Sequence, residues 1–372
     1  MVFYNSPKSK SELKNADHMR ILHVITSLSA GGAEKLLVDL LPQLKSHTID
    51  VDLCLFDGGN TPFRQQIESK GIKTISFGVG NSVYNPWNII RLKKLLSNYD
   101  IIHTHNYSPQ LYVALASGGH YVKLVTTEHS TSNRRRSING FSVIDRWMYN
   151  QYDRIICISK KAENNLRNYI HSDSTKILTV NNGIDTKTYV TARPLINFKP
   201  NGTKAITMVA GFRWEKDQDT LIRSLSYLPD YFHLYLVGDG TRRSECEKKA
   251  VALKLEKRVH FLGMRTDVPQ ILKASDYIVM SSHFEGLSLS SLEGMASGRP
   301  FLASDVDGLK EVVKGAGILF EHKNPDDLAA KILQIEKDPN SYLSIAERCS
   351  QRASLYDISE MAESYIKVYN SI

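Results

Sequence analysis

Residues 276–305 read DYIVMSSHFEGLSLSSLEGMASGRPFLASD and contain two apolar runs separated by a stretch of small and polar residues. The runs DYIVMSS and PFLASD have the length and composition of buried strands, and the stretch between them is long enough for a helix. Apolar strands joined through a helix are typical of parallel sheets covered on both faces. The segment therefore predicts an α/β fold, yet it places Glu285 and Glu293 between two core strands.

The same alternation of strands and helices extends over the whole chain. In the first half the strand-like runs are RILHVITSL, DVDLCLF, IKTISF, DIIHTHN, KLVTTEH, DRIICIS and KILTVNNG. After a linker-like stretch at 189–204 they resume with AITMVAGF, HLYLVGD, VHFLGM, DYIVMSS, PFLASDV and AGILF. Two such blocks predict two Rossmann-like domains whose parallel sheets face each other across a cleft, followed by a helical closing segment.

Length and composition limit the classes of protein that fit. The 372 residues exceed what one compact core holds, so we expect a polar tail at 1–18, a first domain at 19–190 and a second at 191–347. The tail lacks the apolar core of a signal peptide, and no run of 18 apolar residues could span a membrane. Four widely spaced cysteines without a CxxC motif suit free thiols in a reducing compartment. The sequence therefore predicts a cytoplasmic protein.

Positive charge is concentrated in the first half of the chain. Residues 1–190 contain 23 Lys and Arg against 15 Asp and Glu, whereas residues 191–372 contain 24 of each. This excess points to an anionic partner, which charge alone leaves open as a phosphate-bearing substrate, an acidic lipid surface or a nucleic acid. Nucleic acid is disfavoured because no strand motif combining aromatic and basic residues accompanies the charge.

Candidate ligand-binding residues of the first block follow its strands, because ligands of such sheets bind outside the carboxyl ends of the strands. The stretch SAGGAEK opens a helix with Gly31 and Gly32, which would let the backbone approach an anionic ligand closely. A simple tight turn explains these glycines equally well. His129 in TTEHS ends another strand and would face the cleft, with a hydrogen-bonded surface histidine as the equal alternative.

The second block places two cations at a strand-to-helix junction. In AGFRWEKDQDTLIRSL (210–225), Arg213 and Lys216 lie three positions apart, just before a helical pattern. A guanidinium group and an ammonium group at such a junction suit a diphosphate. The alternative is a pair of solvated charges.

The two glutamates of the opening segment flank a predicted helix start. If a helix begins near Ser288, Glu285 lies just before it and Glu293 lies in its second turn. The backbone N–H groups from Gly286 to Ser290 would then form an anion-binding helix N-terminus. We therefore expect Glu285 to accept hydrogen bonds from a sugar diol and Glu293 to do the same for a ribose, unless both only face solvent.

Taken in order, these motifs resemble the family-4 retaining glycosyltransferases of the GT-B fold, often labelled glycosyl transferases group 1. The resemblance covers about residues 19 to 368 and rests on GGAE, EHS, NNGID, GFRWEKDQDTLI, LVGDG, FLG, EGLSLSSLEGMASGRP and DGLKEVV. It implies a transferase that moves a hexose or N-acetylhexosamine from a nucleotide sugar, UDP-linked, with retention of configuration. The acceptor would be a glycan or a lipid-linked sugar in cell-surface polysaccharide synthesis.

The resemblance also implies roles for individual residues. Arg213 and Lys216 would neutralise the diphosphate leaving group, and Glu285 would bind hydroxyl groups of the transferred sugar. Glu293 would bind the ribose, and His129 would lie beside the reacting sugar. The positions whose backbone would contact the donor or leave room for it are Gly31, Gly32, Gly286, Leu287, Ser288 and Leu289. Neither a cofactor nor a catalytic metal is implied, and the helix at 348–372 would return to the first domain.

Two features depart from the family pattern or compete with it. Leu287, Ser288 and Ser290 replace the Phe, Gly and Pro found in many relatives, which puts the shape of the sugar pocket in doubt but not its place. Asp305 and Asp307 match the metal-binding DxD motif of another glycosyltransferase fold. They align with the family's GLKEVV loop, however, so we expect no metal role for them.

A basic and apolar segment leaves the relation to membranes open. Arg134, Arg135 and Arg136 precede Phe141, Ile144, Trp147 and Met148, which have helical spacing. The segment is either a membrane-surface patch or a core-facing helix beside a solvated basic loop. The first alternative would attach the protein peripherally to the inner face of a membrane.

Two other functions fit parts of the pattern. A nucleotide-sugar epimerase of the GT-B fold would use a similar cleft. A non-catalytic sugar-binding protein with two such domains would be periplasmic, and the missing signal peptide argues against it.

Overall fold

A computed structural model describes residues 19–29, 31–46, 49–118, 122–129, 140–172 and 174–372. The expected polar tail at 1–18 and the basic run at 134–136 lie outside the described residues. Contacts divide the chain into two compact units, Met1–Thr127 with Trp147–Arg154 and Ile372, and Glu128–Arg146 with Ile155–Ser371.

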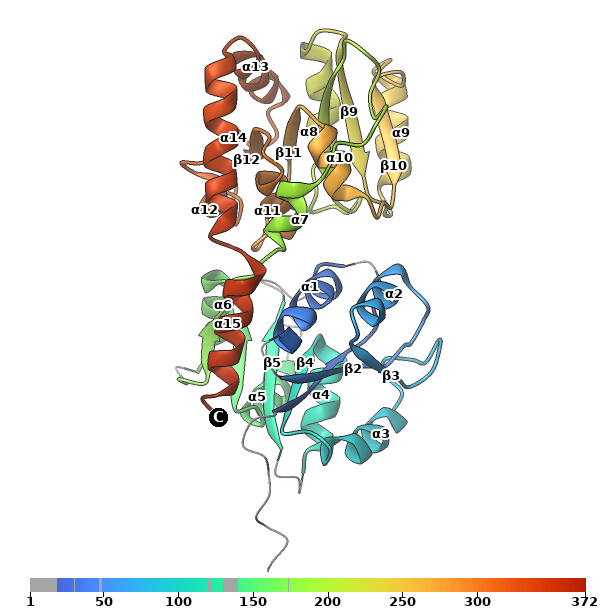
Figure 1. Cartoon of the computed structure of the whole chain (residues 1–372), viewed down its shortest axis with the longest axis vertical. Coiled ribbons are helices and arrows are strands. Elements are labelled where there is room, and N and C mark those ends of the chain that lie inside the picture. Colours follow the sequence, from blue (N-terminus) through green and yellow to red (C-terminus); the bar gives the residue numbers. More distant parts are fainter. Residues whose placement is uncertain (1–18, 30, 47–48, 119–121, 130–139, 173) are drawn as a thin grey trace, which may run out of the picture. The chain divides into compact units, whose positions relative to one another are not determined.

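The first sheet has seven strands in the order β3-β2-β1-β4-β5-β6-β7. All the pairs with a resolved register are parallel: β1–β2, β1–β4, β2–β3, β4–β5 and β6–β7. Helices α1 and α2 lie on one side of the strands and α3 and α4 on the other (Figure 1). The strands are β1 (Arg20–Ile25), β2 (Asp50–Leu55), β3 (Lys73–Ser76), β4 (Ile101–His105), β5 (Lys123–Glu128), β6 (Arg154–Cys157) and β7 (Ile177–Thr179). The helices are α1 (Gly32–Ser46), α2 (Pro62–Ser69), α3 (Trp87–Leu96), α4 (Tyr107–Ala116), α5 (Phe141–Asn150) and α6 (Lys160–Ile170).

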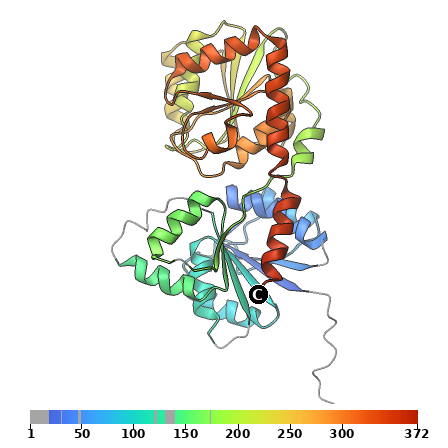
Figure 2. The same cartoon turned by 90° about the vertical axis from the view of Figure 1, so that its left-hand side faces the viewer.

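The second sheet has six strands in the order β10-β9-β8-β11-β12-β13, and its pairs are parallel. The turned view in Figure 2 shows its helices around the strands. The strands are β8 (Lys204–Val209), β9 (Phe232–Val237), β10 (Val259–Gly263), β11 (Tyr277–Met280), β12 (Phe301–Ser304) and β13 (Ile318–Phe320). The helices are α7 (Thr186–Thr191), α8 (Gln218–Ser224), the 3₁₀ helix η2 (Leu225–Tyr227), α9 (Arg243–Ala252), α10 (Val268–Ala274), α11 (Leu289–Ala296), α12 (Lys310–Val313), α13 (Pro325–Glu336), α14 (Pro339–Ser354) and α15 (Ile358–Tyr369).

The strand pattern of the sequence is confirmed, because all thirteen predicted runs contain a strand. The side chains of the central strands β1, β4, β8 and β11 are buried almost throughout, which explains why these runs do not alternate between buried and exposed residues. The two-sheet α/β fold class is therefore confirmed.

The prediction was incomplete at the linker and in the closing helical segment. The stretch at 189–204 begins inside a short helix, α7, whose N-cap Asp185 accepts a hydrogen bond from the backbone N–H of Thr188. The closing segment breaks into three helices because Asp338 and Asp357 each cap the start of a new one. Short polar side chains that bind free backbone N–H groups start helices in this way.

Two glycines allow the loops after β8 and β9 to pack closely together at the carboxyl end of the second sheet. Gly238 and Gly240 have positive φ angles, and a Cβ atom at either would fall within 3.0 Å of the backbone of Ala210 or Phe212. The backbone N–H of Phe212 also donates to the carbonyl of Asp239 at 3.0 Å. The motif LVGDG, which the sequence alone shows only as a turn, is therefore the support of the loop that carries Arg213.

Candidate active site

The predicted donor-site residues of the second sheet come from two neighbouring strands. Strand β8 leads into the loop with Arg213 and Lys216, and β11 leads into the loop with Glu285. The two loops are hydrogen-bonded to each other, since the backbone N–H of His283 donates to the carbonyl of Glu215 at 2.9 Å. Because β8 and β11 are adjacent and parallel, both loops leave the same edge of the sheet.

Lys216 and Glu285 form an ion pair between these loops. The side chains are 20% and 13% exposed, so the pair is mostly, but not fully, shielded from water. The hydroxyl of Ser282 donates to the same oxygen, Oε1 of Glu285, at 2.8 Å. The described residues place no hydrogen-bond donor on the other oxygen, Oε2. A cation and an available carboxylate oxygen therefore lie side by side.

The loop that carries Glu285 is held from behind by the loop after β12. The backbone N–H of Glu285 donates to the carbonyl of Asp307 at 3.2 Å. Gly308 has a φ of +86°, and a Cβ atom there would fall within 3.0 Å of the carbonyl oxygens of Glu285 and Gly286. The DG pair of the DGLKEVV motif thus fixes the position of the carboxylate.

Helix α11 begins where the sequence predicted, directly after Ser288. Ser288 is the N-cap, but its side chain makes no capping hydrogen bond. The first-turn N–H groups of a helix have no acceptor within the helix, and its N-terminus carries partial positive charge. Gly286, Leu287, Ser288 and Leu289 therefore lie at a helix end suited to an anion, next to the ion pair.

Glu293 lies in the second turn of α11, as expected, and only 6% of it is exposed. The helix packs closely on the sheet at this point, since a Cβ atom on Gly294 would come within 2.8 Å of the side chains of Ile278 and Phe301. Arg213, by contrast, is exposed at the end of its loop. The ribose role of Glu293 and the diphosphate role of Arg213 stay predictions.

The predicted residues of the first sheet lie in other places. Gly32 is the first residue of α1, and a Cβ atom there would meet nothing within 4 Å, so the protein's own packing does not require glycine. His129 directly follows β5. Burial lowers the pKa of His129 to about 4, so its imidazole is neutral at neutral pH. Gly31 and Gly32 belong to the first compact unit, whereas His129, Lys216 and Glu285 belong to the second.

Asp305 and Asp307 match a metal-binding DxD motif in the sequence, but we expected no metal role for them. Asp305 forms an ion pair with Lys310 at 3.0 Å, and Asp307 supports the Glu285 loop through its backbone carbonyl. The four cysteines are buried and form no disulfide. No helix among the described residues is long and apolar enough to cross a bilayer.

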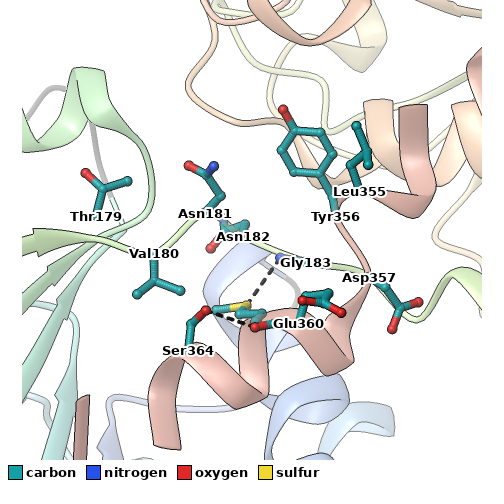
Figure 3. A pocket seen from close by; sticks show the side chains of 11 residues that line it. Thr179, Val180, Asn181, Asn182, Gly183, Leu355, Tyr356, Asp357, Glu360 and Ser364 are labelled. Carbon is teal, nitrogen blue, oxygen red and sulfur yellow. Dashed lines mark hydrogen bonds between the residues drawn. The ribbon is translucent and has the colours of Figure 1, made fainter. Parts of the chain in front are cut away.

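A separate pocket of about 250 Å³ lies where the NNGID motif meets the start of α15 (Figure 3). The backbone N–H of Gly183 donates to the sulfur of Met361 at 3.2 Å, and a Cβ atom on Gly183 would come within 2.9 Å of the carbonyl of Asp357. The predicted site residues do not line this pocket. The close contact with Asp357 explains why NNGID contains a glycine at position 183.

Helix α5 exposes apolar side chains. Val143 is 70% exposed, Ile144 46% and Trp147 42%, whereas Met148 is fully buried. The helix therefore packs one side on the protein, as the core-facing alternative requires, and presents a second apolar strip at the surface.

Two family models match consecutive parts of the chain. The model described as Glycosyltransferase Family 4 matches residues 30–188, and the model described as Glycosyl transferases group 1 matches residues 194–354. Together they cover the second sheet and all strands of the first sheet except β1.

Two curated relatives of the chain are named as glycosyltransferases. A UDP-Gal:alpha-D-GlcNAc-diphosphoundecaprenol alpha-1,3-galactosyltransferase of Escherichia coli is 25% identical over 86% of this chain and 88% of its own length. An N,N'-diacetylbacillosaminyl-diphospho-undecaprenol alpha-1,3-N-acetylgalactosaminyltransferase of Campylobacter jejuni is 28% identical over 58% of this chain, which spans about half, 54%, of that relative.

The crystal structure of Anabaena HepE in complex with UDP and glucose superposes with a TM-score of 0.83 at 21% identity, over 95% of this chain and 100% of that one. That likeness shows the fold. Because the two glycosyltransferase family models match residues 30–188 and 194–354, and the fold is shared with a solved structure over nearly its whole length, the chain belongs to the family-4 glycosyltransferases of the GT-B fold.

Proposed function

We propose that this glycosyltransferase transfers a hexose or N-acetylhexosamine, with retention of configuration, from a UDP-sugar to a lipid-linked glycan acceptor. The observation that carries the proposal is the ion pair of Lys216 and Glu285 beside the N-terminus of α11. A nucleoside diphosphate sugar joins a hydroxyl-rich ring to a dianionic leaving group, and this arrangement offers one group for each part.

The proposed transfer breaks the bond between the anomeric carbon and the diphosphate oxygen. As that bond breaks, negative charge grows on the leaving oxygen, and Lys216 together with the first N–H groups of α11 stabilises it. The acceptor oxygen forms the new bond to the anomeric carbon, and its hydroxyl proton leaves to the departing phosphate. No oxidant, reductant or metal is needed to balance this step.

The carboxylate of Glu285 positions the sugar. Its oxygen Oε2 carries no donor from the described residues and can accept hydrogen bonds from two adjacent hydroxyl groups. Lys216 and Ser282 hold the other oxygen, so the carboxylate is oriented before the donor binds. Arg213, exposed at the end of the neighbouring loop, is a second cation for the diphosphate.

His129 acts as a neutral hydrogen-bonding group in this proposal. Because burial lowers its pKa to about 4, it is not an imidazolium at neutral pH and supplies no positive charge to the leaving group. We propose that it hydrogen-bonds a hydroxyl of the transferred sugar.

The relatives support the donor and the acceptor class. The name of the Escherichia coli relative gives UDP-galactose as donor and a diphosphoundecaprenol-linked sugar as acceptor, and that of the Campylobacter jejuni relative gives an acceptor on the same lipid. An acceptor of this kind lies at a membrane, so we propose that the enzyme works at the cytoplasmic membrane surface.

The test is sugar transfer by Lys216→Ala and Glu285→Ala with a panel of UDP-sugars and short-chain polyprenyl-diphosphate-linked acceptors. Loss of a group that stabilises the developing charge typically costs about 10²–10³ in rate, and we expect each variant to lose at least that. Coupling constants of the product's anomeric proton, read by NMR, give the configuration.

Lys331→Ala is the matched control, because Lys331 forms an ordinary ion pair with Asp327 on α13 at 3.2 Å, away from the proposed site. It should transfer sugar at the wild-type rate. Wild-type turnover by folded Lys216→Ala and Glu285→Ala proteins would contradict the site, and an inverted product would contradict retention.

A further inference from the structure

Three side chains from separate segments lie close together, and two of them belong to the donor-site loops. Asp217 is the N-cap of α8, His283 follows β11, and His322 follows β13. One ligand-type atom from each lies within 4.8 Å of the others. Nδ1 of His283 and Nε2 of His322 are 2.9 Å apart, and their rings stand at 67° to each other. Two imidazole nitrogens and a carboxylate oxygen therefore lie close together.

The protein fixes Asp217 and His283 through further contacts, and His322 is held by its contact with His283. Asp217 is 3% exposed and accepts hydrogen bonds from the N–H of Thr220 at 3.2 Å and its hydroxyl at 2.6 Å. A carboxylate has about four lone-pair positions, so these hydrogen bonds orient the group and leave acceptor positions for a metal ion. The ring of Trp214 packs on that of His283 with centroids 5.3 Å apart. The set is therefore arranged in advance of any ligand.

We propose that Asp217, His283 and His322 bind a divalent transition-metal ion of the zinc class. Two histidines and one carboxylate are a common set of protein ligands for zinc sites that keep a fourth position for water. Nitrogens bound to one zinc ion at about 2.0–2.1 Å lie about 3.3 Å apart in a tetrahedral site. The observed pair needs to open by only a few tenths of an ångström.

The contact between the two rings is compatible with coordination. The hydrogen bond requires that one of the two nitrogens carries a proton. A neutral imidazole can carry its proton on either nitrogen, so each ring can offer a lone pair to a metal ion.

One nearby positive charge, that of Arg242, is already paired with a carboxylate. Arg242 is held by an ion pair with Asp219 at 2.5 Å, on the first turn of α8. Asp217 supplies one negative charge directly to the ion.

Two other histidine groups have similar distances but different geometry. His233 and His260 are 3.0 Å apart between Nδ1 and Nε2, but their rings are parallel within 6°, and no carboxylate joins them within metal-ligand range among the described residues. His23, His103 and His105 are stacked at 11° to 25° and fully buried, so their ring planes do not converge on one ion. The first pair provides a matched control.

A metal at this site would link the two loops of the proposed donor site. Asp217 follows Lys216 directly, and His283 lies two residues before Glu285. The metal site itself does not depend on the proposed sugar transfer, so the two can fail separately.

The test is zinc binding to tag-free full-length protein, measured by competition with a chromophoric chelator. We expect His283→Gln and His322→Gln each to lose one equivalent of zinc that the wild type binds. Asp217→Asn keeps a good helix cap and should lower the zinc affinity by about 10–100-fold. Zinc should also raise the wild-type melting temperature through ligand binding to the folded state.

His260→Gln is the control, since it removes one ring of the parallel pair, and it should bind zinc as the wild type does. Circular dichroism confirms that each variant is folded. Equal zinc stoichiometry in the wild type, His283→Gln and His322→Gln, or an equal loss in His260→Gln, would overturn the site.

Discussion

At the scale of single residues, Gly308 ties the proposed sugar-binding carboxylate to the rest of the second sheet. A Cβ atom there would collide with the carbonyl oxygens of Glu285 and Gly286, and these backbone atoms cannot rotate away. We expect Gly308→Ala to displace the Glu285 loop and lower kcat/KM for sugar transfer by at least about tenfold, because catalytic groups displaced by about 1 Å lose activity on that scale.

Gly315→Ala is the control that separates displacement of the Glu285 loop from backbone strain alone. Gly315 also has a positive φ, +83°, but a Cβ atom there would approach only the guanidinium of Arg352, at 3.9 Å. Both substitutions cost about 1–2 kcal/mol for the left-handed conformation. If the two variants transfer sugar equally well while losing similar stability, Gly308 has no role in holding the loop.

The sequence predicted Lys216 and Glu285 as donor-site residues because each follows a strand, but it did not show that the two side chains pair. Lys216 and Glu285 are 69 positions apart, and only the adjacency of β8 and β11 joins them. The sequence predicts that both strands exist, yet strand order depends on how all the strands pack together. For the same reason Asp217, His283 and His322 show no metal pattern in the sequence.

At the scale of elements, α5 is the segment with the strongest reason to contact a membrane. Ile144 and Trp147 are about half exposed and lie on one strip, next to exposed Arg146. Apolar side chains flanked by basic ones enter the interface of an anionic bilayer. We expect Ile144→Glu with Trp147→Glu to reduce co-sedimentation with phosphatidylglycerol-containing vesicles several-fold.

Leu343→Glu is the matched control for this prediction. Leu343 is 67% exposed on α14, so the substitution adds the same charge at an exposed apolar position of another helix. It should leave vesicle binding unchanged. Vesicle binding that is equal in all three proteins would show that α5 does not contact the membrane.

Local sequence patterns predicted the strands and the start of α11 better than they predicted the segments that connect the elements. Apolar runs in the sequence predicted each strand that the described residues form, and the start of α11 after Ser288 was predicted from the small and polar residues before it. Helix α7 was missed because its sequence, Thr186–Thr191, is rich in β-branched residues. Its N-cap Asp185 was the local signal, and its packing against α10 and α11 adds stability that no local pattern shows.

At the scale of the whole molecule, a histidine buried in the first sheet makes the stability of the protein depend on pH in acid. His23 on β1 is fully buried, and desolvation lowers its pKa from 6.5 to about 3. Between those values the unfolded chain binds a proton at this position that the folded chain does not. The free energy of unfolding therefore rises with pH in this window and falls as the pH is lowered from 6.5.

We expect this one group to remove about 1.4 kcal/mol of stability per pH unit between pH 6 and pH 4. The measurement is unfolding of the first sheet in urea. Reaction of Cys54 with a pyridyl disulfide reports the unfolding, because Cys54 is fully buried on β2, opposite Val24. His23→Asn should flatten the pH dependence by that amount, and His171→Asn, at an exposed position, should not. Parallel pH curves for the wild type and His23→Asn would mean that His23 is protonated alike in both states. The loss of stability in acid would then have to come from other groups of the molecule.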